Sequence, residues 1–412
     1  MLRLLFRKVL AVFLLLLVVL FYGLGVCRAD PPKLYGMLES TLDHATEGRA
    51  IGLSVALISV NWGRFEPARG VLDQVYIQEL VRKKEAFQKL GYKLQIDLGV
   101  QYPPAWIFSL PNARYRNQFG DLFNTNKIGA SLPNVVFNME VRQELGTYFH
   151  DIFANLGTDW DFVRLGCGRY GEFNFPSDKL GIHSNCYWAF DDLAQGKLNG
   201  LPEGIPPCPV PGWIPGTSST GHEDARKFSE WYLDALKNYQ AWQIATVRRD
   251  YNGDICMLYG SWGQRPGWLA AAVDGDLGGL TPPERNGEIQ QGFDWTRMIG
   301  DLKDPKAIVY CTWVDGTLAN RVLADDESDD PTRWSPVHWQ ASLAAANPLK
   351  LRVWGENTGS NTRDTMALSF KLMNRFQLMG IVWAFERDLF ANPNPHGFAT
   401  FDDYRDMIQA NP

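Results

Sequence analysis

The regular alternation of strand-like and helix-like segments limits the fold of this chain more than any other feature. The apolar, β-branched run "LSVALISVNW" (53–62) is followed by "VYIQELVRKKEAFQKLG" (75–91), which has helical spacing and a terminal glycine. The same strand–helix pattern continues to the end of the sequence. Strict alternation predicts parallel strands joined by crossover helices, and near-continuous apolar strands predict a sheet that is buried on both faces.

Eight strand–helix units can be counted if "PKLYGMLE" (32–39) opens the series, with "LDHATEGRAIG" as its short helix. Further strands are predicted at 92–100, 161–168, 254–261, 306–314, 349–357 and 378–385, and further helices at 138–157, 224–253, 288–302, 335–347, 362–377 and 400–410. Eight units predict a closed (β/α)8 barrel of α/β class. A doubly wound open sheet is the alternative, but no GxGxxG motif follows the first strand.

Three segments that follow predicted strands are too long for ordinary connections: 178–224, 263–288 and 315–335. Because each follows a strand, all three are predicted to lie as long βα loops at the C-terminal face of the barrel. Long loops in compact domains tend to form lids or the walls of binding sites.

Residues 1–29 have the pattern of a secretory signal peptide. Three basic residues within positions 3–8 precede an apolar run over 9–26, and Ala29 provides a small residue at the cleavage position. We therefore expect a secreted or extracytoplasmic protein in which 30–412 form one barrel domain. The run could marginally span a bilayer, so an uncleaved membrane anchor is the alternative. A lipoprotein signal at Cys27 is disfavoured by the large Val26 before it.

Charge and the spacing of cysteine and histidine residues limit the partners, cofactors and disulfides that we expect. The net charge is −6 and no basic run occurs beyond the N-terminus, so we expect no nucleic-acid partner. The sequence has no CxxC, HxH or HxxxH spacing, so we expect no metal and no other cofactor. Cys186 and Cys208 lie in one long loop and are the best candidates for a disulfide. The other three are expected to be small buried residues: Cys167, Cys256 and Cys311.

Two glutamates follow strands that face each other across an eight-stranded barrel. Glu172 comes just after the fourth strand, and Glu356 ends the seventh. Active sites of such barrels form at the C-terminal ends of the strands. Two carboxyl groups that flank one bond meet the requirement of glycoside hydrolysis, in which one protonates the leaving oxygen and the other stabilises or attacks the sugar carbon. We predict a protonated Glu172, with its pKa raised by apolar neighbours such as Tyr170 and Phe173 and by the charge of Glu356, and an ionised Glu356.

Other acidic residues near strand ends have structural explanations. A buried acid needs a partner. We expect these pairings: Glu66 with Arg64 or Arg69, Asp97 with Arg164, and Glu386 within its own "ERD" cluster. A surface loop position for Glu172 and a helix-capping role for Glu356 are the corresponding alternatives for the two candidates.

Aromatic residues are abundant, with 15 Trp and an aromatic content of 13%, and several stand where strands end. Flat rings there could cover the apolar faces of sugars, and we expect three or four of these seven to line a cleft: Trp62, Trp106, Tyr170, Trp262, Trp313, Trp354 and Trp383. Five polar residues at the same end could bind sugar hydroxyls: Asn61, Asp97, Gln101, Asp315 and Asn357.

The segments "WGRFEPARGVLD" (62–73) and "GVQYPPAWIF" (99–108) resemble the second and third strand ends of clan A glycoside hydrolases, the β-galactosidase-like families that include family 42. Those enzymes are TIM barrels. The resemblance implies that Glu172 is the acid/base and Glu356 the nucleophile, with Arg64 and Glu66 shaping the site. It extends over nearly the whole mature chain, although only the short strand-end motifs are specific.

One position departs from that pattern. Clan A enzymes usually have Asn before the acid/base glutamate, whereas this chain has Gly171. The runs "GRYGEFNFPS" and "GENTG" are instead similar to family 14 β-amylases, which invert the anomeric configuration. The resemblances thus imply a β-galactoside or related β-linked glycan, with an α-glucan left open, and they leave open whether the reaction retains or inverts.

Two other classes of function remain. A secreted carbohydrate-binding barrel would need the aromatic platforms but no catalytic acid, and a metal-dependent barrel hydrolase would lose activity in the presence of a chelator. A serine hydrolase is poorly supported, because no GxSxG motif occurs at a strand-to-helix turn.

Overall fold

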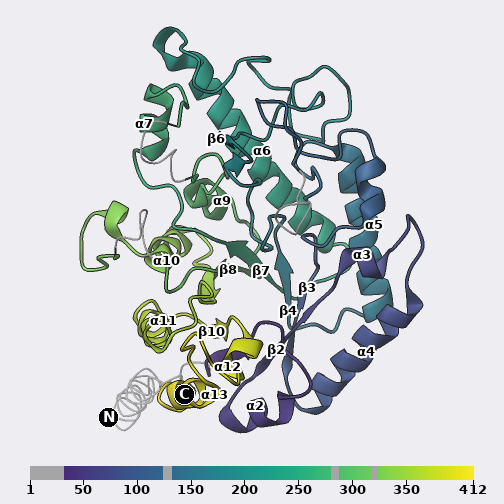
Figure 1. Cartoon of the computed structure of the whole chain (residues 1–412), viewed down its shortest axis with the longest axis vertical. Helices are drawn as coiled ribbons and strands as arrows, with labels where there is room; N and C mark the ends of the chain where they lie inside the picture. The colour runs from purple at the N-terminus through teal and green to yellow at the C-terminus, as the bar shows by residue number, and fades with distance from the viewer. Residues whose placement is uncertain (1–31, 124–131, 280–286, 317–322) are drawn as a thin grey trace, which may run out of the picture. The chain divides into compact units, whose positions relative to one another are not determined.

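Eight parallel strands form one sheet, which the computed structural model shows at the centre of the fold (Figure 1). They are β1 (Leu34–Met37), β2 (Val55–Ser59), β3 (Lys93–Asp97), β4 (Phe162–Leu165), β7 (Asp254–Tyr259), β8 (Ala307–Cys311), β9 (Arg352–Gly355) and β10 (Gly380–Trp383). From β1 to β9 each strand pairs with the next in this series, and β10 pairs with β1. The structure describes residues 32–123, 132–279, 287–316 and 323–412.

The sheet closes between β9 and β10 through a few contacts. The amide of Met379 donates to the carbonyl of Val353 at 2.8 Å, and Glu356 forms a parallel bridge with Val382. The result is a nearly closed (β/α)8 barrel, which confirms the predicted fold and excludes the open doubly wound sheet. Residues 33–412 form one compact unit, whereas the predicted signal peptide lies outside the described residues. No helix in the described ranges is long and apolar enough to cross a membrane.

Eight helices follow the strands and match the predicted series: α2 (Ala45–Ile51), α4 (Gln74–Lys89), α5 (Met139–Leu156), α6 (Glu223–Val247), α9 (Trp295–Gly300), α10 (Pro336–Ala346), α11 (Arg363–Arg375) and α13 (Phe401–Gln409). Side-chain caps start most of them. Thr362 and Thr400 each form a capping box at the start of α11 and α13. The helix predicted over 288–302 is shorter than expected, because Gly292 has a φ of +79° and Asp294 caps the helix only from Trp295 onward.

Short elements in the loops were not predicted. Within the described residues they are α3 (Trp62–Phe65), α7 (Trp268–Asp274), α12 (Glu386–Leu389), the 3-10 turns Ala105–Ser109, Thr220–His222 and Pro331–Arg333, and a hairpin of β5 (Lys179–Leu180) and β6 (His183–Ser184). All are seven residues or shorter, too short to show a clear period in sequence.

The hydrophobic core has two parts. The larger part fills the space between the strands and the surrounding helices. The smaller part lies inside the barrel and includes Phe162, Tyr310 and Trp354, whose rings pack edge to face. Because side chains alternate along a strand, one set of residues fills the barrel and the other contacts the helices.

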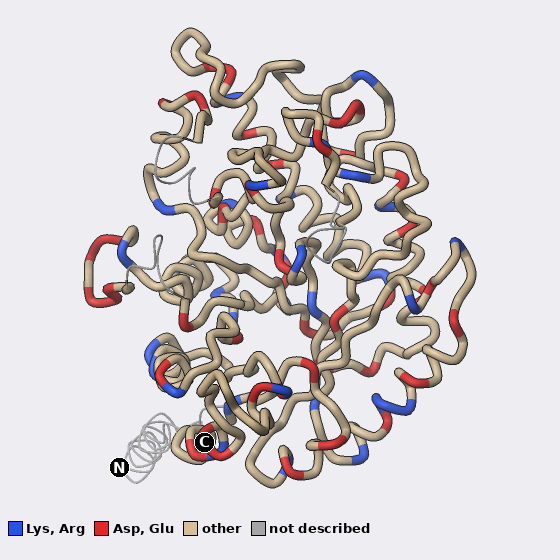
Figure 2. Tube along the Cα trace, in the orientation of Figure 1, with Lys and Arg blue, Asp and Glu red and all other residues tan. Residues whose placement is uncertain are grey.

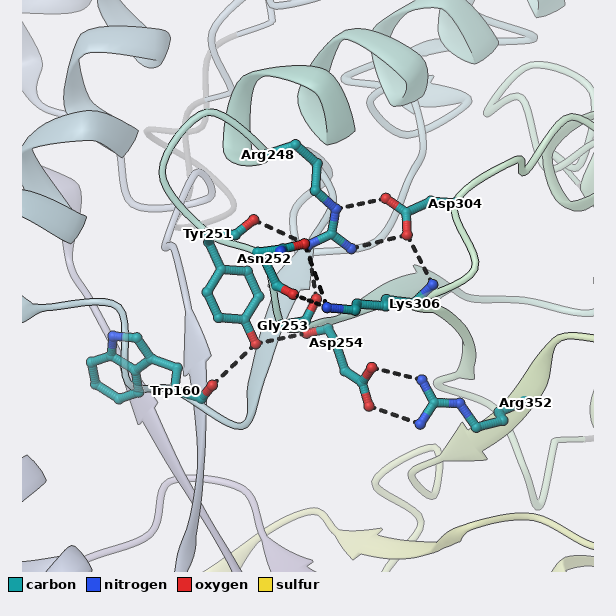
Figure 3. A network of polar contacts seen from close by, with 9 residues as sticks. All are labelled: Trp160, Arg248, Tyr251, Asn252, Gly253, Asp254, Asp304, Lys306 and Arg352. Atoms are coloured by element: carbon teal, nitrogen blue, oxygen red, sulfur yellow. Dashed lines mark hydrogen bonds and ion pairs between the residues drawn. The ribbon is translucent and has the colours of Figure 1, made fainter.

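Polar contacts join the N-terminal ends of three neighbouring strands (Figure 3). Arg248, just after α6, donates to the two carboxylate oxygens of Asp304 at 2.6 and 3.0 Å and to two carbonyls in the turn 251–253. Arg352 at the start of β9 binds Asp254 at the start of β7 through two hydrogen bonds of 2.7 Å. The end of the barrel opposite the predicted site is therefore fixed by side chains as well as by the sheet.

The described cysteines, 167, 186, 208, 256 and 311, are all free and buried. The predicted disulfide between Cys186 and Cys208 is therefore wrong. Cys186 packs in the core and accepts a hydrogen bond from the side-chain amide of Asn117 at 3.4 Å. The burial expected for Cys167, Cys256 and Cys311 is confirmed. Acidic and basic residues are interspersed along the described chain (Figure 2), and the absence of a nucleic-acid partner stays a prediction.

Candidate active site

A cavity of about 790 Å³ lies at the C-terminal ends of the barrel strands. Residues that end or follow every strand of the barrel contribute to its lining, and both Glu172 and Glu356 are among them. The structure therefore brings together the two glutamates that lie 184 positions apart in the sequence (356 minus 172).

Glu172 is held by a tight turn after β4. The amide of Gly171 donates to the carbonyl of Gly168 at 3.0 Å, and the amides of Cys167 and Gly168 donate to the carbonyl of Glu172 at 3.0 and 2.7 Å. Gly171 has a φ of +87°, a conformation that strains any residue with a side chain. This backbone geometry favours glycine at position 171.

The Glu172 side chain is buried in a setting that favours its neutral form. Its pKa is raised from 4.5 to about 7, chiefly by burial. The Thr312 hydroxyl, which donates to Oε1 at 2.9 Å, acts to lower this pKa. The charge of Glu356 acts to raise it, and Arg164 acts to lower it. The expected contribution of Tyr170 to this burial is not seen, since the Tyr170 side chain is exposed. Phe173, in contrast, is fully buried.

Glu356 occupies the opposite electrostatic setting. The guanidinium of Arg164 donates to Oε2 at 3.0 Å, and the Tyr310 hydroxyl donates to the same oxygen at 3.0 Å. Burial raises the pKa of Glu356, whereas Arg164 and Tyr310 act to lower it. Burial acts to lower the pKa of Arg164, but the charge of Glu356 outweighs that effect and raises it. Because the guanidinium stays charged, we assign Glu356 the ionised form.

One strand supports both glutamates. Tyr310 lies in β8 and binds Glu356, while Thr312, two residues further along, binds Glu172. Residues two apart on a strand point to the same side, about 7 Å apart along the chain. Sequence reasoning did not identify Tyr310 or Thr312 as site residues, and it gave Arg164 only a structural role. The sequence signal that could have identified Tyr310 and Thr312 is their alternate spacing as polar residues in and just after an otherwise apolar strand.

Three of the seven predicted aromatic residues line the cavity: Tyr170, Trp262 and Trp313. This number agrees with the three or four expected. Three others are fully buried, so they have no surface for a sugar, and their candidate role in substrate binding is corrected. Trp354 points into the barrel, Trp383 packs near Tyr404 of α13, and Trp62 stacks on Tyr148 of α5.

Trp106 and Arg64 are also placed away from the cavity. The indole of Trp106 donates to the carbonyl of Glu66 at 3.0 Å. Arg64 is exposed, binds Glu79 at 3.2 Å and lies over the ring of Tyr76. Neither residue lines the cavity, because Arg64 lies on the surface and Trp106 packs within the loops. Their expected roles in substrate binding are therefore corrected.

The polar residues expected in the site divide in the same way. Asp97, Gln101 and Asn357 line the cavity, but Asn61 and Asp315 do not. The Asn357 side chain is committed to the fold, since its oxygen accepts from the amide of Ala384 at 2.7 Å and its nitrogen donates to Asn361 at 2.8 Å.

The expected pairings of the other acids are largely wrong. Glu66 accepts hydrogen bonds from the Trp62 indole and the Gly70 amide rather than pairing with an arginine. Glu386 accepts from the backbone and hydroxyl of Thr41. The carboxylate of Asp97 accepts from Gly99 and Gln101, while Arg164 contacts Glu356 instead.

A further buried acid, Glu288, lies behind the cavity wall. Ser261, which lines the cavity, donates a short hydrogen bond to Glu288, and burial raises the pKa of Glu288 to about 8. The cavity lining includes Ser261 but not Glu288. We therefore assign Glu288 to the support of the wall rather than to the site.

No known family model matches the chain, and no curated protein sequence matches it. The fold, however, is similar to solved structures. The catalytic domain of a β-amylase from Paenibacillus polymyxa has a TM-score of 0.63 at 16% identity, covering 92% of this chain and 98% of that domain. β-Galactosidases from Bacillus circulans sp. alkalophilus and Marinomonas ef1 have TM-scores of 0.57 and 0.53 at 10% and 13% identity, over 93% and 86% of this chain.

These similarities confirm the fold that the sequence motifs implied. The chain spans almost the whole β-amylase domain, but only 56% and 54% of the two β-galactosidase chains. At 10–16% identity, the shared feature is the barrel architecture.

Proposed function

We propose that the protein is a glycoside hydrolase that cleaves O-glycosidic bonds of oligo- or polysaccharides with Glu172 and Glu356. The observation that carries this proposal is the contrast between the two acids in one cavity. Glu172 has a raised pKa and a neutral hydroxyl donor, whereas Glu356 contacts the charged guanidinium of Arg164. A protonated acid beside an ionised carboxylate is the arrangement that this reaction needs.

In the proposed reaction, the carboxyl group of Glu172 gives its proton to the glycosidic oxygen as the bond from that oxygen to the anomeric carbon breaks. The bonding electron pair leaves with the oxygen, and positive charge develops on the sugar. Ionised Glu356 stabilises that charge, and either bonds to the anomeric carbon as a nucleophile or takes a proton from an attacking water. Arg164 and Tyr310 keep Glu356 ionised and oriented.

Two substrate types follow from the resemblances. A β-galactosidase-like reaction on β-linked glycans is the first. An inverting, β-amylase-like reaction on glucans is the second, and the turn at Gly171 favours it, because a φ of +87° suits the glycine of the family 14-like motif. A non-catalytic carbohydrate-binding barrel is the remaining alternative.

The test is a screen of the purified chain against chromogenic α- and β-glycosides and oligosaccharides, in the presence and absence of a chelator. NMR detection of the first product anomer separates retention from inversion. We expect hydrolysis that is insensitive to chelator and is lost by orders of magnitude in Glu172→Gln and Glu356→Gln. Sugar binding without any turnover in the wild type would instead support the binding barrel.

A further inference from the structure

The turn that carries Glu172 also carries a cation without a counter-ion. Arg169 is half-buried and lines the cavity. Its guanidinium lies 5.1 Å from the centre of the Tyr170 ring, and within the described residues it has no ion pair and donates no side-chain hydrogen bond. Arginine stays charged at any pH at which the protein is folded, so this cation is always available to an anion.

The other charged residues of the cavity are already engaged. Arg164 is paired with Glu356, and Glu39 forms an ion pair with Arg387. The buried carboxylate of Asp97 accepts two hydrogen bonds, as described above, and adds to the negative charge that surrounds Arg164. Arg169 is therefore the cation in the described lining that the proposed mechanism does not use.

The position of Arg169 is fixed relative to the proton donor. Arg169 and Tyr170 are the two central residues of the turn that the Gly171 to Gly168 hydrogen bond closes, and Glu172 follows directly. Tyr170 is 66% exposed although its ring is apolar, which leaves a free aromatic surface next to a free guanidinium. Aromatic faces suit the apolar faces of sugars, and a guanidinium binds a carboxylate or a sulfate with two parallel hydrogen bonds.

We propose that the glycan bound in this cavity carries an anionic group, which Arg169 binds while Tyr170 contacts the same or the adjoining sugar ring. The shared chemistry is an oxyanion with two acceptor oxygens, as in the carboxylate of a hexuronic acid or a sulfate ester. This inference rests on the proposed function, because it names the substrate class of the same site.

Binding, rather than turnover, is the test, so that the result does not depend on whether the site hydrolyses the sugar. Every protein in the experiment carries Glu172→Gln, which keeps any substrate intact. Isothermal titration calorimetry is run with two matched pairs of oligosaccharides: an oligogalacturonide with its carboxyl-reduced counterpart, and a sulfated galacto-oligosaccharide with its desulfated counterpart. The pair that shows a preference identifies the source of the anion.

We expect one anionic member to bind at least about tenfold more tightly than its neutral counterpart. Arg169→Gln should abolish that preference, and Arg169→Lys, which keeps the charge but loses the planar fork, should keep part of it. Arg249→Gln is the matched control. It removes one exposed arginine from the loop between α6 and β7, at the other end of the barrel, and should leave the preference unchanged.

The proposal is overturned if neither anionic member binds more tightly than its neutral counterpart, or if a preference survives in Arg169→Gln. Failure of the proposed function gives a different result. In that case the wild type cleaves no glycoside of the screen, while the Arg169-dependent preference is still measured in the binding experiment. Equal thermal unfolding of the Gln variants shows that any loss of binding does not come from unfolding.

Discussion

The surroundings of Glu172 and Glu356 favour different protonation states for two identical side chains. Both are buried, with 8% and 7% of their surface exposed. Glu172 meets a neutral hydroxyl, whereas Glu356 meets a guanidinium and a hydroxyl. Desolvation alone would favour the protonated form of both, and the placement of Arg164 in β4 separates them.

The pH dependence of kcat/KM should report this difference. The proposed mechanism needs protonated Glu172, so we expect kcat/KM to fall about tenfold per pH unit above the Glu172 pKa of about 7. On the acid side, kcat/KM should fall as Glu356 takes up a proton. This limb should lie at a pH above the ordinary pKa of glutamate, because burial raises the pKa of Glu356. Initial rates between pH 4 and pH 9 measure both limbs. A basic limb that persists in a Glu172→Gln variant would contradict the assignment.

The same pKa predicts an effect on stability. A carboxyl group with a raised folded-state pKa contributes stability below its unfolded pKa of 4.5, and this contribution is lost as the pH rises through about 7. At pH 8–9 the wild type carries a buried charge that Glu172→Gln does not. We expect the variant to be more stable there by up to about 3 kcal/mol, and no more stable near pH 4, as measured by urea unfolding.

Gly260, just after β7, leaves the space that the Glu172 carboxyl occupies. A Cβ at this position would lie 2.6 Å from Glu172 Oε1 and 3.1 Å from Thr312 Oγ1. We expect Gly260→Ala to displace the carboxyl group and to lower kcat by about 100-fold or more. The control is Gly146→Ala in α5, where the nearest atoms are 3.6 Å away and alanine favours the helix. Equal activity of the two variants would argue against a role for Glu172.

At the scale of elements, the two ends of the barrel have separate tasks. The contacts of Arg248 with Asp304 and with the turn 251–253 fix the N-terminal ends of the strands, away from the cavity (Figure 3). We expect Arg248→Met to lower the free energy of unfolding by about 1.5–3 kcal/mol, because it removes charge-assisted hydrogen bonds that are largely shielded from water. Below the unfolding temperature, kcat should change less than about twofold, since strand N-termini in such barrels serve stability. A large loss of kcat in the folded variant would show that the two ends are coupled.

The positions of the strands could be predicted from the sequence, but the directions of their side chains could not. Eight apolar runs were sufficient to identify the barrel and to place Glu172 and Glu356 at the same end. Trp354 is the next-to-last residue of β9 and Trp383 the last residue of β10, and one points into the barrel whereas the other packs near Tyr404 of α13. A shift of one residue in a strand exchanges its two faces, and the sequence pattern of a strand buried on both faces does not fix that register.

The site residues that sequence reasoning missed share one property. Tyr310 and Thr312 act through contacts with residues that follow other strands, 46 and 140 positions away in the sequence. No local sequence motif predicts such contacts. The errors in the expected ion pairs have the same origin, because Glu66 and Asp97 are satisfied by indole, amide and backbone donors instead of by arginines.

At the scale of the whole molecule, the chain is a barrel of ordinary architecture with an export signal predicted before it. We propose that cleavage follows Ala29, so that the exported protein begins at Asp30. Mass spectrometry of protein recovered outside the cytoplasm should give the mass of 30–412 with five free thiols, since the described cysteines are unpaired. Recovery of the full-length mass from the membrane fraction would indicate an uncleaved anchor. A mass about 2 Da below that of 30–412 with five free thiols would indicate a disulfide.

The barrel brings both glutamates to the lining of one cavity. Its architecture is similar to that of a β-amylase domain and of β-galactosidases. We propose that substrate choice depends on the turn 168–172, which places Arg169 and Tyr170 in the lining of the cavity.

The most direct measurement compares wild type and Glu172→Gln on two glycosides of the sugar that the screen identifies, one with a sugar leaving group and one with dinitrophenol. Dinitrophenolate departs without a proton, so the acid matters only for the sugar leaving group. We predict that kcat/KM, which reports the step that breaks the glycosidic bond, falls about 100- to 10,000-fold on the first substrate and less than about tenfold on the second. Equal losses on both substrates, or no loss on the first, would contradict the assignment of Glu172 as the proton donor.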